Sequence, residues 1–201
     1  SIGNVISPID LIDDYGVDPV RYYLMREMVL GHDSNFTIES FIKRYNSDLA
    51  NDFGNLFSRV TTLIKKNYNQ IIPEPGQPGN QEKSIHSDSD KLVKNVKTLF
   101  NQMRLNEGIE EILQFIRSMN KYMEKNEPWK TVKFDKIAAA KILYTAGESL
   151  RIAALLLSPV MPNRTKKILK TFNCDNNSYD WGGLQPGLSM KEHDILFPRI
   201  K

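Results

Sequence analysis

The amino-acid sequence predicts an all-α protein folded as an antiparallel helix bundle. Apolar residues recur at steps of three and four through most of the 201 residues, which is the spacing of one face of an α-helix. Most prolines fall between these periodic segments, and no part of the chain is rich in β-strand patterns. Amphipathic helices separated in this way are expected to pack side by side as a bundle.

The first two predicted helices cover residues 18–30 and 37–68. Asp18 is expected to cap the first helix, with Pro19 at its first helical position and Gly31 at its end. The second is the strongest periodic segment of the chain. Its apolar face is formed by Ile38, Phe41, Ile42, Tyr45, Leu49, Phe53, Leu56, Phe57, Val60, Leu63 and Ile64. At about 100° per residue these side chains lie on one side of a single long helix.

Residues 71–90 contain three of the ten prolines together with Gly, Ser and Asp, and they have no helical period. We therefore expect a surface loop there, tolerated as an insertion. Further helices are predicted over residues 92–103, 109–123, 135–157 and 163–172. The third of these is Ala-rich and apolar on several faces, so we expect it at the centre of the bundle. Irregular chain then runs to the terminal L-F-P-R-I-K.

The composition excludes several classes of protein. The formal net charge of +3 is mildly basic, which permits a nucleic-acid partner without requiring one. The single cysteine, Cys174, excludes an internal disulfide framework and fits a reducing, cytoplasmic compartment. Three scattered histidines have no ligand spacing, so we expect no metal site. No apolar run reaches the length of about 18 residues that a membrane span needs, so we expect no membrane partner.

Patterns for catalysis are also missing from the sequence. No pair of carboxylates, Ser-His-Asp order or Cys-His pair stands out along the chain. Neither of the phosphate-binding patterns, G-x-G-x-x-G and G-x-x-x-x-G-K-[ST], is present. We therefore predict no catalytic residue and no cofactor-binding residue. The residues alone indicate a binding module.

A polar stripe lies opposite the apolar face of the predicted helix 37–68. It is formed by Arg44, Asp48, Asn51, Asn55, Arg59, Thr62 and Lys66. Asn55 and Arg59 are four residues apart, so their side chains meet on one helical turn. Asn offers a donor and an acceptor to a base edge, and Arg offers a rigid fork to a base or a phosphate. The pair suits single-stranded RNA, whose base edges are free to be read. The alternative is an ordinary solvated surface.

A tryptophan directly after a proline, in the stretch N-E-P-W-K at residues 126–130, marks a second candidate site. Trp129 can offer a ring face to an unstacked base, with Pro128 fixing its approach. The lysines expected to attract phosphates nearby are Lys121, Lys125, Lys130 and Lys133. The alternative is a tryptophan that packs at a helix end as a hydrophobic staple. The residues alone leave both alternatives open.

Several stretches of the sequence resemble one known family. S-I-G-N-V-I-S-P, followed by L-I-D-D-Y-G-V-D-P-V-R-Y-Y-L-M-R-E, resembles the segment after the K-M-S-K-S loop of class I aminoacyl-tRNA synthetases. The resemblance narrows to methionyl-tRNA synthetase through four further stretches, R-Y-N-S-D-L-A-N-D-F-G-N-L-F-S-R, N-E-P-W-K, A-G-E-S-L-R-I-A-A-L-L-L-S-P-V-M-P and L-F-P-R-I-K. It covers nearly the whole chain, apart from residues 71–90.

This resemblance implies a division of the chain into three segments. Residues 1–35 would be a stem-contact segment that follows the K-M-S-K-S loop, and residues 36–175 an α-helical anticodon-binding bundle. Residues 176–201 would be a C-terminal peptide that packs back on the bundle and the stem-contact segment. The implied partners are the anticodon stem-loop of tRNA(Met) and the catalytic domain of the same chain.

The resemblance also implies roles for particular side chains. In the family, the Trp of the x-P-W motif stacks on the first anticodon base, and the Asn and Arg of the N-L-x-x-R motif read anticodon bases. These positions fall on Trp129, with Pro128 shaping its approach, and on Asn55 and Arg59. The anticodon implied is C-A-U, that of methionine.

An activity is implied for a longer parent protein, methionine–tRNA ligase, which uses ATP and Mg, with Zn as a further candidate. The H-I-G-H motif, the methionine pocket, the zinc-bearing insertion and the lysines of K-M-S-K-S have no counterpart in this sequence, which also lacks an initiator Met. We therefore expect a fragment that has no cofactor and is inactive alone. The alternatives are a helical protein-interaction scaffold and the anticodon domain of another class I synthetase.

Overall fold

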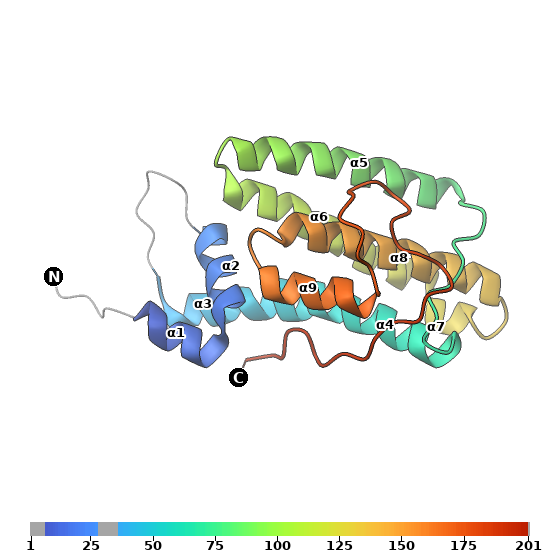
Figure 1. Cartoon of the computed structure of the whole chain (residues 1–201), viewed down its shortest axis with the longest axis horizontal. Helices are drawn as coiled ribbons and strands as arrows, with labels where there is room; N and C mark the ends of the chain where they lie inside the picture. The colour runs from blue at the N-terminus through green and yellow to red at the C-terminus, as the bar shows by residue number, and fades with distance from the viewer. Residues whose placement is uncertain (1–6, 28–35, 201) are drawn as a thin grey trace.

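The predicted all-α bundle is confirmed. The computed structural model describes residues 7–27 and 36–200, and within these ranges it contains helices, one isolated antiparallel bridge and no strand. The long helices lie side by side, with the irregular C-terminal tail across one side of the bundle (Figure 1). The helices are α1 (Pro8–Tyr15), α2 (Val17–Glu27), α3 (Ile38–Arg44), η1 (Tyr45–Gly54), α4 (Asn55–Asn67), α5 (Asn80–Asn101), α6 (Leu105–Asn126), α7 (Pro128–Thr131), α8 (Lys136–Leu157) and α9 (Pro162–Thr171).

Helix α8 lies at the centre of the bundle, as its composition predicts. Every residue from Ile142 to Leu157 is buried, and the helix packs against α4, α5, α6, α7 and α9. Small residues permit these close approaches. A Cβ added at Gly147 would lie 3.0 Å from a methyl group of Leu184 in the tail. The Ala-rich composition, together with Gly147, is therefore what allows so many neighbours around one helix.

Residues 38–67 form one continuous helical path of three parts, α3, η1 and α4. The middle part is a π-helix, whose hydrogen bonds join residues five apart and change the angular position of the residues within it. The predicted apolar face is confirmed at Leu49 and Phe53, both fully buried. The predicted polar stripe is wrong at Asp48, which is only 1% exposed. The 100° rule fails there because η1 does not have the α-helical period.

The buried carboxylate of Asp48 joins three helices. Its Oδ2 accepts a hydrogen bond from the hydroxyl of Tyr22 on α2 at 2.7 Å, and its Oδ1 lies 3.2 Å from the guanidinium of Arg117 on α6. Arg117 also donates to Asp52 at 2.7 Å. Burial, together with the charge of Asp48, raises the pKa of Tyr22 well above 10.0. The hydroxyl therefore remains a donor to Asp48 at physiological pH.

Asp18 does not cap its own helix, so the predicted N-cap is wrong. Helix α2 begins one residue earlier, at Val17. The Asp18 carboxylate, 3% exposed, instead accepts hydrogen bonds from the backbone N–H of Arg164 at 2.5 Å and the side-chain amide of Asn163 at 3.2 Å. The carboxylate thereby caps the N-terminus of α9, where free N–H groups and the helix dipole favour an anion. The predicted end of the helix at Gly31 lies outside the described residues.

The predicted surface loop at residues 71–90 is wrong in its second half. Residues 80–90 are helical and form the first part of α5. Their apolar signal is weak because the buried face of this stretch combines Ile85 with two polar residues, Glu82 and Ser89. A search for apolar period alone therefore finds only the C-terminal half of the helix.

A buried ion pair on α8 fastens the C-terminal tail to the bundle. Glu148 and Arg151 are both 0% exposed and pair at 2.6 Å. The Glu148 carboxylate accepts the backbone N–H groups of residues 182–184 at 2.8–3.0 Å. Arg151 donates to the carbonyls of Ser178 and Asp180, each at 2.6 Å. The pair thus satisfies backbone groups of a segment that has no helical or sheet partner of its own.

The tail then returns to the N-terminal helices (Figure 1). Phe197 packs against Phe53 with ring centroids 5.9 Å apart. Asn46 exchanges two hydrogen bonds with the backbone of Ile200, one to its carbonyl at 2.8 Å and one from its N–H at 3.0 Å. The side chain of Ile200 completes a small apolar cluster formed by Leu11, Val20, Tyr23 and Phe41. The N-terminal helices therefore share their core with the distant end of the chain.

We expect Asp48→Ala to lower the free energy of unfolding by about 3 kcal/mol, because it leaves the Tyr22 hydroxyl and Arg117 without their buried partner. Asp88→Ala is the control, since Asp88 forms an exposed ion pair with Lys91. Its loss should cost about 1 kcal/mol or less. Urea denaturation measures both changes. An equally small loss for the two variants would contradict a structural role for the Asp48 network.

The stability of the fold should depend on pH through Glu82. Its carboxylate accepts hydrogen bonds from the Tyr122 hydroxyl at 2.7 Å and the Gly79 N–H at 2.8 Å. Burial alone would raise the pKa of Glu82, but these bonds and the charge of Lys141 outweigh burial, so the pKa lies below its ordinary value of 4.5. A carboxylate with a lowered pKa stabilises the fold above its unfolded-state pKa, and this contribution is lost as pH falls through the folded-state pKa.

We therefore expect Glu82→Gln to be less stable than the unsubstituted chain at about pH 6 and to approach it in stability near about pH 3. Thermal unfolding measured across this range tests the expectation. A stability difference that does not change with pH would show that the ionised form of Glu82 is not the stabilising one.

Candidate nucleic-acid interface

Trp129 lies on the short helix α7, whose start is fixed by the end of α6. Glu127 ends α6 in the left-handed conformation with φ 41°, which is uncommon for a residue with a side chain. Pro128 is buried at the first position of α7, where its fixed φ suits a helix. The Thr131 hydroxyl donates back to the carbonyls of Asn126 at 2.9 Å and Glu127 at 3.2 Å. The N-E-P-W-K stretch is thus a hydrogen-bonded corner that holds Trp129 at one end of the bundle (Figure 1).

Arg59 of α4 covers one face of the Trp129 ring. Its guanidinium carbon lies 5.0 Å from the ring centroid, which is a cation–π distance. The same guanidinium lies 3.8 Å from the carboxylate of Glu124 on α6. The Arg59 side chain is 24% exposed and Trp129 is partly exposed, so both can be reached from solvent. The structure therefore brings together two of the predicted site residues from different helices.

Asn55 lies at the first position of α4, one turn before Arg59, and it is exposed. The helix that carries it is held by α6, because the side-chain amide of Asn120 donates to the carbonyl of Asp52 at 3.0 Å. Helix α6 leads directly into the corner at Trp129. The placement of Asn55 relative to Trp129 thus depends on the packing of η1 and α4 against α6, and on α8, which packs against α4, α6 and α7.

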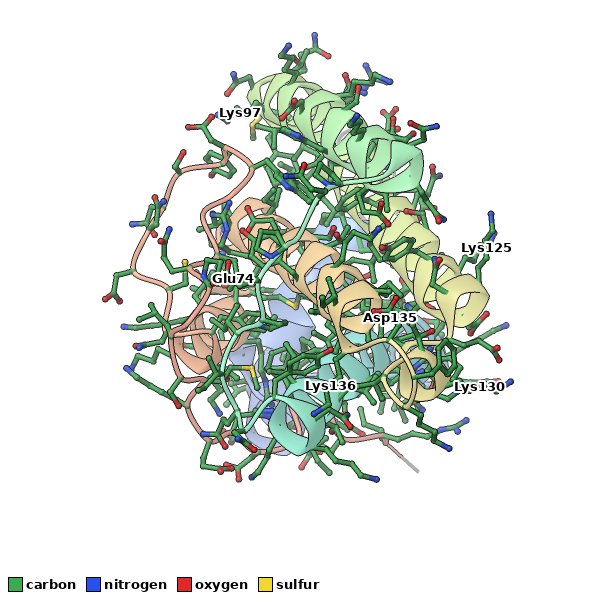
Figure 2. All side chains as sticks on the ribbon, turned by 90° about the vertical axis from the view of Figure 1, so that its right-hand side faces the viewer. Glu74, Lys97, Lys125, Lys130, Asp135 and Lys136 are labelled. Carbon is green, nitrogen blue, oxygen red and sulfur yellow. The ribbon has the colours of Figure 1, made fainter. Side chains whose placement is uncertain are left out.

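Exposed lysines surround this end of the bundle. They are Lys121, Lys125, Lys130, Lys133 and Lys136. Lys125 and Lys130 project outward beside α7, with Lys136 at the start of α8 (Figure 2). Lys130 is paired with Glu127 at 2.7 Å, and the other four have no carboxylate within 4.0 Å among the described residues. Unpaired lysines at this density attract a phosphate backbone in a salt-dependent manner.

The polar stripe on the long helix is shorter than predicted. Asp48 is buried, and Arg44 donates to Glu27 at 2.6 Å. The exposed remainder consists of Asn51, Asn55, Thr62 and Lys66, with Arg59 partly exposed among them. Sequence reasoning missed Glu124 as a neighbour of Arg59. The only feature of the sequence that could have indicated this contact is an acidic side chain among lysines. That feature is common on helix surfaces and therefore does not identify a partner of Arg59.

The side chains gathered here have the chemistry of a binding surface. They offer an aromatic face, a guanidinium and an amide, groups that stack on nucleobases and hydrogen-bond to their edges. Within residues 7–27 and 36–200, no group of three or more His, Cys, Asp or Glu side chains could hold a metal ion. A search of the described helices for one long and apolar enough to span a membrane finds none.

The class of protein that this fold and surface define is a helical RNA-binding domain. Comparison with family models is more specific. Residues 72–201 match the anticodon binding domain of methionyl tRNA ligase, and residues 1–61 match the class I tRNA synthetases of the methionine type. The chain belongs to the methionyl-tRNA ligase family. The alternative of an anticodon domain from another class I synthetase has no support in these matches.

Individual relatives agree with the family match. The chain is 36% identical to the methionine–tRNA ligase of Caldanaerobacter subterraneus subsp. tengcongensis and 37% identical to that of Clostridium tetani. Each match covers all of this chain and 32% of the relative. The chain therefore spans about a third of the length of these curated relatives.

Solved structures of the same family share the fold. The crystal structure of the apo form of Mycobacterium tuberculosis methionyl-tRNA synthetase gives a TM-score of 0.92 at 31% identity, over 99% of this chain and 42% of that one. The structure of the same enzyme bound by methionyl-adenylate also gives 0.92, at 32% identity, over 98% of this chain and 41% of that one. The division of the present chain at residues 35 and 175 stays a prediction.

Removal of the Arg59 guanidinium should uncover the Trp129 ring. In a Trp181→Phe background Trp129 is the only remaining tryptophan. There we expect Arg59→Ala to increase the quenching of tryptophan fluorescence by acrylamide, because the 5.0 Å contact over the ring is lost. Arg104→Ala, which removes an exposed arginine at the other end of α6, should leave quenching unchanged. Equal quenching in all three proteins would contradict the Arg59–Trp129 contact.

Proposed function

We propose that this chain is the tRNA-binding part of a methionine–tRNA ligase and that it reads the C-A-U anticodon of tRNA(Met). The observation that supports this most directly is the position of the Arg59 guanidinium, 5.0 Å from the centroid of the Trp129 ring. An arginine and an aromatic ring from separate helices meet on an exposed, lysine-rich surface. This is the combination expected of a site that takes an unstacked base.

Each side chain has a distinct role in this proposal. The Trp129 ring stacks on the first anticodon base, and Pro128, buried at the start of α7, fixes the approach of the ring. Asn55 offers a donor and an acceptor to a base edge, and Arg59 offers its planar fork to a base or a phosphate. The surrounding lysines contribute affinity that does not depend on sequence, whereas the base contacts contribute specificity.

Stacking of a base on the face of the Trp129 ring that Arg59 covers in the free chain requires an exchange of the two contacts. A partly exposed cation–π contact stabilises by about 0.5–1 kcal/mol. Base–aromatic stacking contributes about 1–3 kcal/mol. The exchange is therefore favourable even if the original contact is lost completely. It also releases Arg59 to bind the RNA at the moment when the base arrives.

The whole protein, in this proposal, attaches methionine to tRNA(Met) in protein synthesis in the cytoplasm. Formation of methionyl-adenylate uses ATP and Mg, with Zn as a further candidate, and it belongs to a catalytic domain of the same chain. The residues present here supply no step of that reaction. Their contribution is to bind the anticodon stem-loop, so that the rest of the tRNA is presented to the catalytic domain.

A comparison of two RNA hairpins tests the proposal. We expect the chain to bind a methionine-anticodon stem-loop more tightly than the same stem-loop with its first anticodon base changed. Trp129→Ala should weaken binding of the first RNA by about 1–3 kcal/mol, and Trp129→Phe, which keeps a ring, should weaken it less. Fluorescence anisotropy with labelled RNA measures affinity, and circular dichroism confirms that helicity is unchanged.

The salt dependence provides a second criterion in the same experiment. The logarithm of affinity should fall with the logarithm of salt concentration by about 0.7 for each phosphate that the chain neutralises. Equal affinity for the two hairpins would refute anticodon reading. Binding that is insensitive to salt would indicate the alternative of a protein-interaction scaffold.

A further inference from the structure

Phe134 is the most exposed of the large apolar side chains among the described residues, at 79%. It lies in the turn between α7 and α8. A ring in water normally gains about 1.5–3 kcal/mol by burial, so a ring left this exposed has a surface free for a ligand. Ile137, the second residue of α8 and three positions after Phe134, is 77% exposed. No role is assigned to either residue by the proposed anticodon contacts.

The turn that carries Phe134 is held by hydrogen bonds. The Phe134 N–H donates to the Thr131 carbonyl at 3.1 Å, and the Asp135 N–H donates to the same carbonyl at 2.8 Å. The Asp135 carboxylate accepts the N–H of Ala138 at 2.9 Å and so caps α8. Val132, within the turn, is 9% exposed and anchors it to the bundle. The ring is thus presented to solvent from a fixed backbone, which lowers the entropy lost when a ligand stacks on it.

Phe134 lies close enough to Trp129 for one RNA loop to contact both rings. They are five positions apart in the chain, and five residues span at most about 17 Å. A stacked nucleic-acid strand advances about 3.4 Å per nucleotide, so this limit corresponds to about five stacked nucleotides. The two residues are therefore close enough in the chain for a single hairpin loop to reach both.

The charge around Phe134 fits an RNA partner better than a protein partner. Lys133 and Lys136 flank the ring in sequence, and neither has a carboxylate within 4.0 Å among the described residues. The carboxylate of Asp135 is engaged in capping α8. Lysine is depleted at protein–protein interfaces, whereas an aromatic ring among lysines is typical of surfaces that bind single-stranded nucleic acid.

We propose that Phe134 is a second stacking platform, which takes a base of the anticodon loop other than the first anticodon base. This inference rests on the proposed function and adds Phe134 to the residues that contact the RNA. Lys133 and Lys136 bind the phosphates on either side of that base. The loop is then held at two aromatic points, Trp129 on α7 and Phe134 in the turn that joins α7 to α8.

The test uses the 201-residue chain and the methionine-anticodon stem-loop as probe. We expect Phe134→Ala to weaken binding about 5- to 150-fold, the range of one base–aromatic stack. Met103→Ala is the matched control, since Met103 is 59% exposed in the turn between α5 and α6, away from α7. It should leave affinity unchanged. Thermal unfolding is expected to be the same for both variants, because neither side chain is part of the core.

A second set of probes identifies the base. Stem-loops with a single abasic site at each loop position are titrated against the unsubstituted chain and against Phe134→Ala. At one position other than the first anticodon base, removal of the base should weaken binding to the unsubstituted chain and have no further effect on Phe134→Ala. Additive losses at every position would overturn the inference, because Phe134 would then contact no particular base.

The outcomes separate this inference from the proposed function. Unchanged affinity for Phe134→Ala, together with weakened binding by Trp129→Ala, would overturn the second platform and support anticodon reading. Unchanged affinity for both variants would overturn both. Loss of self-association in Phe134→Ala by analytical ultracentrifugation, with RNA affinity unchanged, would assign the ring to a second copy of the chain and also overturn the inference.

Discussion

The buried carboxylate of Asp48 is the interaction on which the rest of the molecule depends. It lies in η1, receives the Tyr22 hydroxyl from α2 and pairs with Arg117 from α6. Helix α4 continues from η1 and carries Asn55 and Arg59, while α6 leads to the corner that carries Trp129. The relative position of the two halves of the candidate site is therefore set by a contact in the middle of the bundle. The site needs such a contact between helices, because the Trp129 ring and the Arg59 guanidinium come from different helices.

The same region shows how far a sequence can predict the fold. The long apolar face of residues 38–64 correctly predicts a continuous helix, and the Ala-rich stretch at 136–157 correctly predicts a central one. Neither prediction includes the π-helical turns at Tyr45–Gly54. Apolar period identifies which side of a helix is buried over long distances. It does not reveal a local π-helix such as η1, whose residue Asp48 contacts Tyr22 and Arg117 from other helices.

Two other differences have the same physical origin. Apolar period does not detect the start of α5, because Glu82 and Ser89 take positions that apolar residues usually fill. The sequence predicts Asp18 as a cap of the nearest helix in the chain, whereas its carboxylate reaches α9 across the fold. At the candidate site, the sequence predicted which residues to consider, Asn55, Arg59, Pro128 and Trp129. It could not predict that Arg59 would cover the ring, or that Glu124 would lie beside it, because both facts depend on how α4 packs on α6.

The hydrogen bonds between Asn46 and Ile200 have a consequence for biosynthesis. The two residues are 154 positions apart, so at about 5–20 residues per second the partner of Asn46 is synthesised about 8–30 s later. Until then, the cluster around Phe41 lacks the side chain of Ile200 and remains open on one side. The N-terminal helices therefore complete their core only after the rest of the bundle has been synthesised. Until then, a ribosome-bound chain would expose this apolar surface to chaperones.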